Sequence, residues 1–189
     1  IVILDNKICT VNISIDDTYT IGSPDNKYYD VVMNPSNLRR NDLSKTFSIL
    51  IDLGYRRYRI ALIGSYLSCD SDCAVLEDRS LLVLQDDFLI KIDVLGETLA
   101  EVKRIDSFGS NFGIFRIQKG YVIYGEIEIT MLNDMLEKQW TFSGKDIFVT
   151  QSTKKPFVIL DDAIELFDWE NNYYKIDFKG NLMEECPAK

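Results

Sequence analysis

The chain has 189 residues, which is enough for one sizeable domain or two small ones. It carries 30 acidic and 21 basic residues, for a formal net charge of −9, and it has no histidine. Without imidazole, Ser-His-Asp and Cys-His catalysis and most zinc, copper and non-haem iron sites are excluded, so we expect a non-enzyme with no cofactor and no metal.

The negative charge is concentrated after residue 60. Residues 1–60 carry seven acids and eight Lys or Arg, whereas residues 61–189 carry 23 acids and 13 Lys or Arg. This asymmetry argues against nucleic acid or an anionic membrane as the main partner and favours a basic protein. We expect a single β domain over 1–189, with a possible subdivision into a less acidic part, 1–66, and an acidic repeat part, 67–189. We also expect a cytoplasmic protein, with secretion as the alternative because the sequence begins at Ile1 rather than Met.

Strand patterns dominate the chain, and only Pro35–Leu43 has the signals of a short helical turn. The predicted strands are short segments rich in Ile, Val, Phe and Tyr. They are Val2–Leu4, Thr10–Ile15, Phe47–Leu53, Tyr58–Ile63, Leu81–Leu84, Phe88–Ile92, Gly113–Ile117, Tyr121–Tyr124, Glu126–Met131, Phe157–Leu160, Ile164–Phe167 and Tyr173–Phe178. Apolar residues alternate in Glu126–Met131, which predicts a half-buried strand. Turns rich in Asn, Asp and Gly separate the strands, so we expect a meander of hairpins.

One segment of the chain recurs. Gln85–Gly96 aligns without gaps to Trp169–Gly180, and both contain Lys-Ile-Asp, an apolar residue, a spacer and Gly. Weaker Ile-Asp-like strand ends occur at Ile15, Ile51 and Ile129, which gives a period near 40 residues. A period of this length with several strands in each unit is typical of propeller blades.

In the segment Ser80–Lys103, a strand ends at a turn, a second strand ends at Asp93, and a turn led by Gly96 returns into a third strand at Thr98–Val102. This segment resembles a blade of the pyrroloquinoline-quinone or WD type of β-propeller. Trp140 lies where quinone-type blades often have a Trp, and the resemblance extends loosely over residues 80–189. The WD-type dipeptides and the Ala-x-Asp-x-x-x-Gly pattern are absent, so the resemblance implies no cofactor site.

These patterns together predict an all-β fold. The preferred form is a small, propeller-like meander of about five blades, since five units of ~38 residues would use up the chain. The alternative is a β-sandwich or a bent open sheet built from the same hairpins.

The four cysteines are expected to be reduced. Cys69 and Cys73 flank two aspartates, and a four-thiolate metal site would need Cys9 and Cys186 as well, without the usual paired motifs. A redox disulfide is disfavoured because the neighbouring acids raise thiol pKa values. A calcium site would draw on four acids but lacks the glycine and spacing of known loops. Those acids are Asp70, Asp72, Glu77 and Asp78.

One basic cluster stands out between residues 39 and 59. It consists of Arg39, Arg40, Lys45, Arg56, Arg57 and Arg59, with Tyr55 and Tyr58 among them. Such a cluster could suit RNA or a phosphate, or it could match acidic residues elsewhere in the chain.

Acids and aromatics combine in Ile164–Tyr174, where we expect Phe167 and Tyr174 in the core and Trp169 at the surface. The predicted partner-binding residues are Asp86, Asp87, Asp161, Asp162, Glu165, Asp168, Trp169 and Glu170. The preferred hypothesis is a non-catalytic protein-binding module, in concrete form a bacterial immunity protein that covers the active site of a basic nuclease toxin with carboxylates. The alternatives are a propeller-type scaffold or sensor domain of a larger protein, and a carbohydrate-active enzyme with converging acids.

Overall fold

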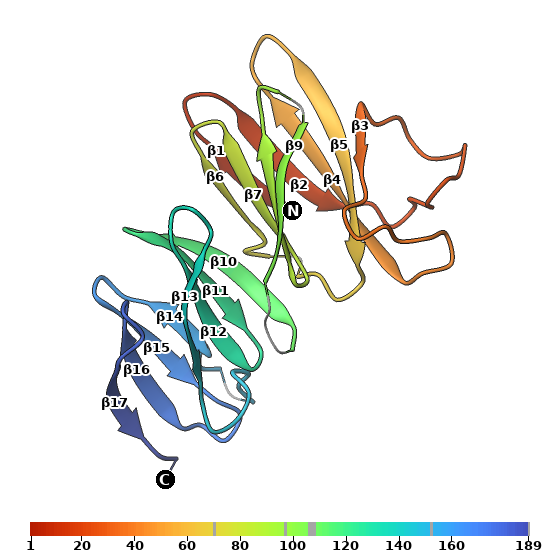
Figure 1. Cartoon of the computed structure of the whole chain (residues 1–189). Helices are drawn as coiled ribbons and strands as arrows, with labels where there is room; N and C mark the ends of the chain where they lie inside the picture. Colours follow the sequence, from red (N-terminus) through yellow and green to blue (C-terminus); the bar gives the residue numbers. More distant parts are fainter. Residues whose placement is uncertain (70, 97, 106–108, 152, 189) are drawn as a thin grey trace. The chain divides into compact units, whose positions relative to one another are not determined.

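The computed structural model describes residues 1–69, 71–96, 98–105, 109–151 and 153–188. These residues form seventeen strands and no helix, arranged in four sheets (Figure 1). The predicted all-β meander of hairpins is therefore confirmed. Within this described part, no helix is long and apolar enough to cross a membrane.

The first sheet contains four meander strands and one added strand, in the order β1-β2-β4-β5-β3. Its strands are β1 (Val2–Asp5), β2 (Thr10–Ile15), β3 (Val31–Met33), β4 (Ser44–Asp52) and β5 (Arg57–Ser65). The added strand, β3, belongs to the insertion, residues 16–43, between β2 and β4, and it pairs in parallel with the outer edge of β5.

The other three sheets are four-stranded antiparallel meanders in chain order. The second contains β6 (Ala74–Glu77), β7 (Ser80–Gln85), β8 (Phe88–Asp93) and β9 (Thr98–Arg104). The third contains β10 (Asn111–Ile117), β11 (Gly120–Gly125), β12 (Glu128–Leu132) and β13 (Lys138–Ser143). The fourth contains β14 (Phe157–Ile159), β15 (Ala163–Phe167), β16 (Tyr173–Asp177) and β17 (Leu182–Cys186).

A four-stranded antiparallel meander is the blade unit of a propeller, so the fold is propeller-like. The described residues form four such sheets rather than about five. The difference arises in the first sheet, because the insertion makes it extend from Val2 to Ser65.

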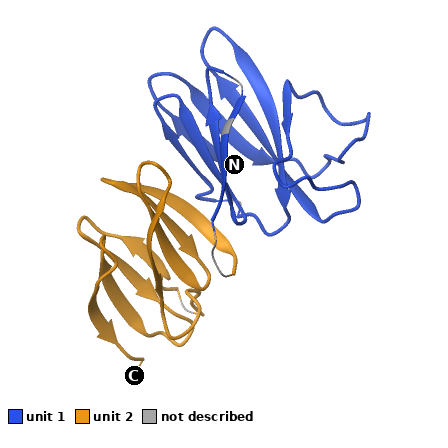
Figure 2. Cartoon of the chain, viewed as in Figure 1, with its two compact units in different colours: residues 1–105 blue, residues 106–189 orange. Residues whose placement is uncertain are grey.

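The four sheets form two compact units, residues 1–105 and residues 106–189 (Figure 2). Unit 1 holds the first two sheets and unit 2 holds the last two. The charge boundary near residue 66 lies inside unit 1, in the connection after β5.

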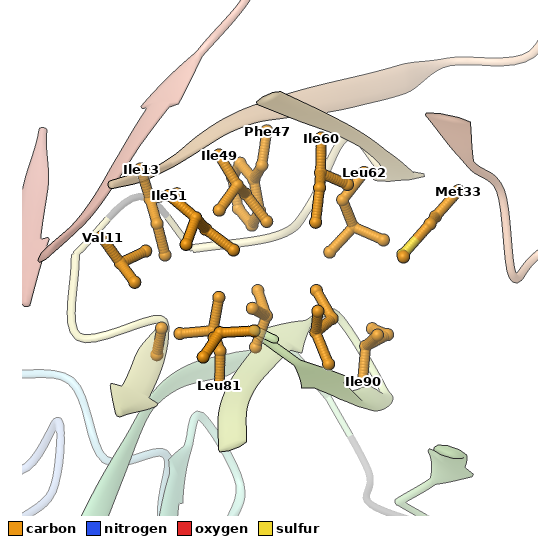
Figure 3. Close-up of a cluster of buried hydrophobic side chains, with 14 of the residues drawn as sticks. Val11, Ile13, Met33, Phe47, Ile49, Ile51, Ile60, Leu62, Leu81 and Ile90 are labelled. Carbon is orange, nitrogen blue, oxygen red and sulfur yellow. The ribbon is translucent and has the colours of Figure 1, made fainter. Parts of the chain in front are cut away.

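The core of unit 1 is built from the facing sides of its two sheets. Every second residue of β2, β4 and β5 points inward, among them Val11, Ile49 and Ile60, as strand geometry requires. Leu81 and Ile90 of the second sheet point toward them (Figure 3). The core of unit 2 is formed in the same way by the third and fourth sheets, together with Phe148 from the connection between β13 and β14. Its other buried residues are Val122, Ile129, Met131, Ile164, Leu166, Tyr174 and Ile176.

The sequence repeat marks one position in every sheet. Asp52, Asp93, Asn133 and Asp177 each follow or end the third meander strand, at separations of 41, 40 and 44 residues. In each case a side-chain oxygen accepts the backbone N–H two residues later, at 2.8–3.0 Å. The repeat is therefore an Asx turn that closes the hairpin to the fourth strand.

Two of the predicted repeat positions are corrected by this assignment. Ile129 lies inside β12, and the strand reaches its turn at Asn133 instead. Ile15 ends β2, the second meander strand, so it does not occupy the repeated position.

A polar aromatic side chain joins the two sheets within each unit. Tyr58 on β5 donates its hydroxyl to the carbonyl of Val94, and Trp140 on β13 donates its ring N–H to the carbonyl of Phe178 at 3.1 Å. Val94 and Phe178 are equivalent residues of the repeat, each one position after the turn aspartate. The Trp140 ring also lies against Gly180, where a Cβ would come within 2.8 Å of it.

The predicted helical turn at Pro35–Leu43 is wrong. This segment consists of two successive turns, with Asn37 at a φ of 53°. The side chain of Asn34 bonds both the N–H and the carbonyl of Leu38, at 3.0 and 2.9 Å. These bonds offer the backbone an alternative to a helix.

Candidate functional site

Asp168 was predicted to contact a partner, and the structure corrects this. Its side chain is fully buried, at 0% exposure. One carboxylate oxygen accepts the backbone N–H of Asn172 at 2.8 Å, and the other accepts the Asn172 amide at 2.8 Å and the Tyr174 hydroxyl at 2.9 Å. Asp168 therefore holds the β15–β16 turn in shape and has no carboxylate surface to offer a partner.

Asp86 and Asp87 lie in the β7–β8 turn of unit 1. Asp86 adopts a φ of 58°, which suits a tight hairpin turn. Burial raises its pKa, and a hydrogen bond from Ser65 opposes that rise. Asp87 forms an ion pair with Arg104 at 2.8 Å. Both carboxylates are half-buried and serve contacts within unit 1.

The other predicted residues lie in unit 2 and are separated along β15. Asp161 and Asp162 are exposed in the turn before this strand, and Trp169 and Glu170 are exposed in the turn after it. Trp169 is 41% exposed. A five-residue strand spans ~17 Å, so the two turns lie at opposite ends of the fourth sheet.

Between these turns lies the face of the fourth sheet that points away from the core of unit 2, here called the outer face. It carries Glu165, Phe167, Tyr173, Lys175 and Glu184. Glu165, Lys175 and Glu184 form one cross-strand row, and Phe167 and Tyr173 are paired in the next. Alternation places these side chains opposite the buried Ile164, Leu166, Tyr174 and Ile176.

The rings and carboxylates of the outer face contact one another. The Tyr173 hydroxyl donates to Glu165 at 2.9 Å, and the rings of Phe167 and Tyr173 have their centroids 5.3 Å apart. Burial and then the Glu165 contact raise the pKa of Tyr173 to about 12, so this phenol stays neutral and keeps its hydrogen bond at physiological pH. The Lys154 ammonium lies over the Phe167 ring, 4.8 Å from its centroid.

Sequence patterns found part of this surface. Glu165 and Trp169 were in the predicted set, and Tyr174 is buried as expected. Phe167 was expected in the core but is half-buried on the outer face. Tyr173 and Glu184 were missed, although the cross-strand row follows from aligning the hairpins once the strand ends are known.

The predicted basic cluster is not one site. Arg39, Arg40 and Lys45 lie near the start of β4, whereas Arg56 and Arg57 lie at the opposite end of the β4–β5 hairpin. Nine residues of strand separate these ends by ~30 Å. Arg57 also forms an ion pair with Asp52 at 2.7 Å, and Tyr58 is buried in the core of unit 1.

Among the described residues, the four cysteines are thiols rather than disulfides, as expected. Cys9 and Cys73 belong to the core of unit 1, and Cys186 is exposed on β17 in unit 2. Burial, followed by the charge of Asp5, raises the pKa of Cys9, which disfavours a reactive thiolate. In the described part of the chain, no group of three or more side chains is placed to hold a metal ion. Asp70, one acid of the considered calcium set, lies outside the described residues.

Neither a comparison with models of protein families nor a comparison with curated proteins finds a match for this sequence. Among solved structures, the chain is similar to the CNH domain of AfRom2, with 13% identity, a TM-score of 0.45 and coverage of 78% of this chain and 48% of that one. It is also similar to BamB from Moraxella catarrhalis, with 11% identity, a TM-score of 0.46 and coverage of 87% and 54%. For Hsv2 from Kluyveromyces marxianus the values are 7%, 0.41, 79% and 48%.

The propeller-like fold rests on the four-stranded meanders of the chain itself and not on these likenesses, whose TM-scores are all below 0.5. The chain spans about half the length of each of these structures.

Proposed function

We propose that the chain is a non-catalytic protein-binding module and that the outer face of the fourth sheet contacts the partner. The proposal rests on the acid–aromatic composition of this face and on its exposure. Glu165, Phe167, Tyr173 and Lys175 remain half-exposed, and Glu184 is exposed. Trp169 extends the face at the end of β15.

One internal comparison carries the proposal. The β7–β8 hairpin of the second sheet occupies the equivalent place, with two residues in its turn instead of five, and its paired residues provide the comparison. Leu82 pairs with Lys91 and Leu84 with Leu89, in the places where Glu165 pairs with Lys175 and Phe167 with Tyr173. The three leucines are buried.

The matched positions of the fourth sheet have thus exchanged aliphatic side chains for a carboxylate and two aromatic rings. A sheet face that only packs in a core carries aliphatic side chains at such positions, because burying a carboxylate costs free energy. Aromatic residues with nearby charge are typical of protein interfaces.

The outer face carries two carboxylates with Lys175 between them, and an aromatic ring, and these carboxylates and this ring can contact cations of a basic partner. Glu165 and Glu184 supply carboxylates, and Phe167 supplies a ring that already holds the ammonium of Lys154. An Arg or Lys of a partner could make the same ring contact while pairing with a carboxylate. The net charge of −9 would speed the encounter with a basic protein.

In the most specific form of this proposal, the partner is a basic nuclease toxin and the chain is its immunity protein. Charge alone supports this form, since carboxylates on a stable scaffold can mimic phosphates. Inhibition assays with a captured nuclease would separate it from a scaffold or sensor domain, because a scaffold would bind its partner without blocking an active site.

The experiment is affinity capture at low ionic strength, with the wild type and the double variant Glu165→Lys/Glu184→Lys immobilised in parallel. We expect basic proteins to bind the wild type, to be lost from the variant and to elute with increasing salt, since exposed charge contacts are screened over ~10 Å at 0.1 M salt.

The matched control is Asp25→Lys/Asp42→Lys, which makes the same change in charge at exposed positions of unit 1. It should retain the partner. Equal loss from both double variants would show that only net charge matters and would contradict the assignment of the outer face.

A further inference from the structure

A cavity of about 380 Å³ opens in unit 1, where the insertion leaves β2 and rejoins the sheet at β4. This volume is within the range of small-molecule sites. Its lining includes Asp16, Asp17, Tyr19, Lys45, Thr46 and Tyr66.

The wall around Asp16 is held in place by hydrogen bonds. One of its carboxylate oxygens accepts the hydroxyl of Tyr29 at 2.6 Å and lies 3.2 Å from the Lys27 ammonium. The other accepts the hydroxyl of Thr18 at 2.7 Å. This network fixes the insertion against the sheet, so the cavity is formed before any ligand arrives.

Thr46 contributes a hydroxyl to the lining of the cavity. The residue is only 3% exposed, and its backbone carbonyl accepts the N–H of Asp16 at 2.9 Å. A hydroxyl that faces a cavity can both donate to and accept from a ligand there.

The charges of the cavity balance. Asp16 is paired with Lys27, and the other charged residues of the lining are one acid, Asp17, and one base, Lys45, whose ammonium also donates to the carbonyl of Ser68. A ligand with net charge would gain little here, whereas a neutral ligand with several hydroxyl groups could both donate to and accept from this lining.

Two tyrosine rings complete the lining. Tyr19 contacts Tyr29 edge-on, with centroids 5.7 Å apart and planes at 77°. Tyr66 is 62% exposed at the rim, with the Lys45 ammonium 5.8 Å from its ring centroid. An aromatic ring at a rim offers an apolar platform to a ligand that is polar along its edge.

We propose that this cavity binds a neutral hexopyranose unit of a carbohydrate. Such a sugar ring is uncharged, has hydroxyls along its edge for Thr46, Asp17 and Lys45, and has an apolar C–H face for Tyr66. This site lies in unit 1 and is independent of the protein-binding surface in unit 2.

The test is saturation-transfer NMR on the full chain, with methyl glucoside, methyl galactoside, methyl mannoside and N-acetylglucosamine as probes. At least one neutral sugar should bind, with a dissociation constant of about 1 mM, as expected for a small ligand in an open site. Glucuronate and glucosamine, which are charged, should bind more weakly.

Tyr66→Ala should weaken this binding about tenfold, and Thr46→Val about fivefold, from the loss of a ring contact and of a hydrogen bond. The matched control is Tyr55→Ala, which removes a tyrosine that is 81% exposed at the other end of the β4–β5 hairpin. It should leave the affinity unchanged.

Either of two results would overturn the proposal. One is the absence of saturation transfer to all four neutral sugars with folded wild-type protein. The other is equal binding by the Tyr66→Ala and Tyr55→Ala variants. Neither result would affect the capture experiment, which depends on residues of unit 2.

Discussion

Asp168 and Glu170 are two residues apart and have opposite roles. Asp168 is buried and accepts hydrogen bonds from Asn172 and Tyr174, whereas Glu170 is exposed. Both are acids next to Trp169, so the sequence pattern predicted both as partner-binding residues. Only the fold distinguishes them, because the bonds of Asp168 reach residues four and six positions away.

Asp168→Ala should destabilise the protein by about 3 kcal/mol, because it leaves three buried donors without an acceptor. Glu170→Ala should change the unfolding free energy by less than about 0.5 kcal/mol, as is usual at an exposed site. Urea unfolding measures both. Similar stabilities of the two variants would contradict the structural role of Asp168.

The ionisation of Asp16 predicts how the stability of the protein depends on pH. Burial opposes its charge, but hydrogen bonds from Tyr29, Thr18 and Lys27 outweigh this and lower its pKa from 3.8 to about 2. Because the folded pKa lies below the unfolded one, the ionised carboxylate stabilises the protein fully above about pH 4, and that stability is lost as the pH falls toward 2.

Asp16→Asn should therefore lower the unfolding free energy at pH 7 by about 2 kcal/mol. The gap between wild type and variant should close between pH 4 and pH 2, as measured by denaturant unfolding at each pH. A gap of constant size down to pH 2 would show that the carboxylate charge is not what stabilises the insertion.

At the scale of elements, all twelve predicted strands overlap strands of the structure. Five strands of the structure were not predicted from strand patterns, and each of them lies at the edge of its sheet: β3, β6, β9, β13 and β17. Thr98–Val102, within β9, was anticipated only through the resemblance to a blade. Edge strands lack a clean alternation because water reaches more of their surface, and charged residues there prevent unwanted pairing. In β17, for example, Glu184 and Glu185 are consecutive in the sequence and every residue is exposed.

The alternation in Glu126–Met131 located β12 correctly but misjudged its burial. The strand is buried throughout, including Glu128 and Thr130. Polar residues at every second position predict a solvated face. The pattern could not show that both faces of this strand are covered, because coverage depends on segments far away in the sequence.

The contact between Trp140 and Gly180 can be tested against a matched glycine. Gly180 and Gly54 have φ angles of +83° and +80°, so alanine is strained at both. A Cβ would meet Trp140 at Gly180 but would find open space at Gly54. Gly54→Ala should cost about 1 kcal/mol, and Gly180→Ala about 3 kcal/mol, because overpacking adds to the backbone strain.

Thermal or urea unfolding of both variants measures this difference. The double variant Gly180→Ala/Trp140→Ala should lose most of the extra destabilisation relative to Trp140→Ala alone, since the clash is then removed. If Gly54→Ala and Gly180→Ala are equally stable, the ring does not pack against the fourth sheet as described.

At the scale of the whole molecule, the two units use one architecture for different surfaces. Both join their sheets with an aromatic donor, Tyr58 or Trp140, and both close hairpins with Asx turns. The sequence repeat exposed this similarity, because turn geometry constrains residue identity. The outer face could not be found in the same way, because it depends on which strands pair and in what register.

The most direct test of the proposed function is to map the contact with a captured basic partner by amide chemical shifts of the labelled chain. We predict that the largest shifts fall on Glu165, Phe167, Tyr173 and Glu184 and that they diminish as salt is added. Shifts confined to residues 1–105, or unaffected by salt, would contradict the assignment of the outer face of the fourth sheet as the binding surface.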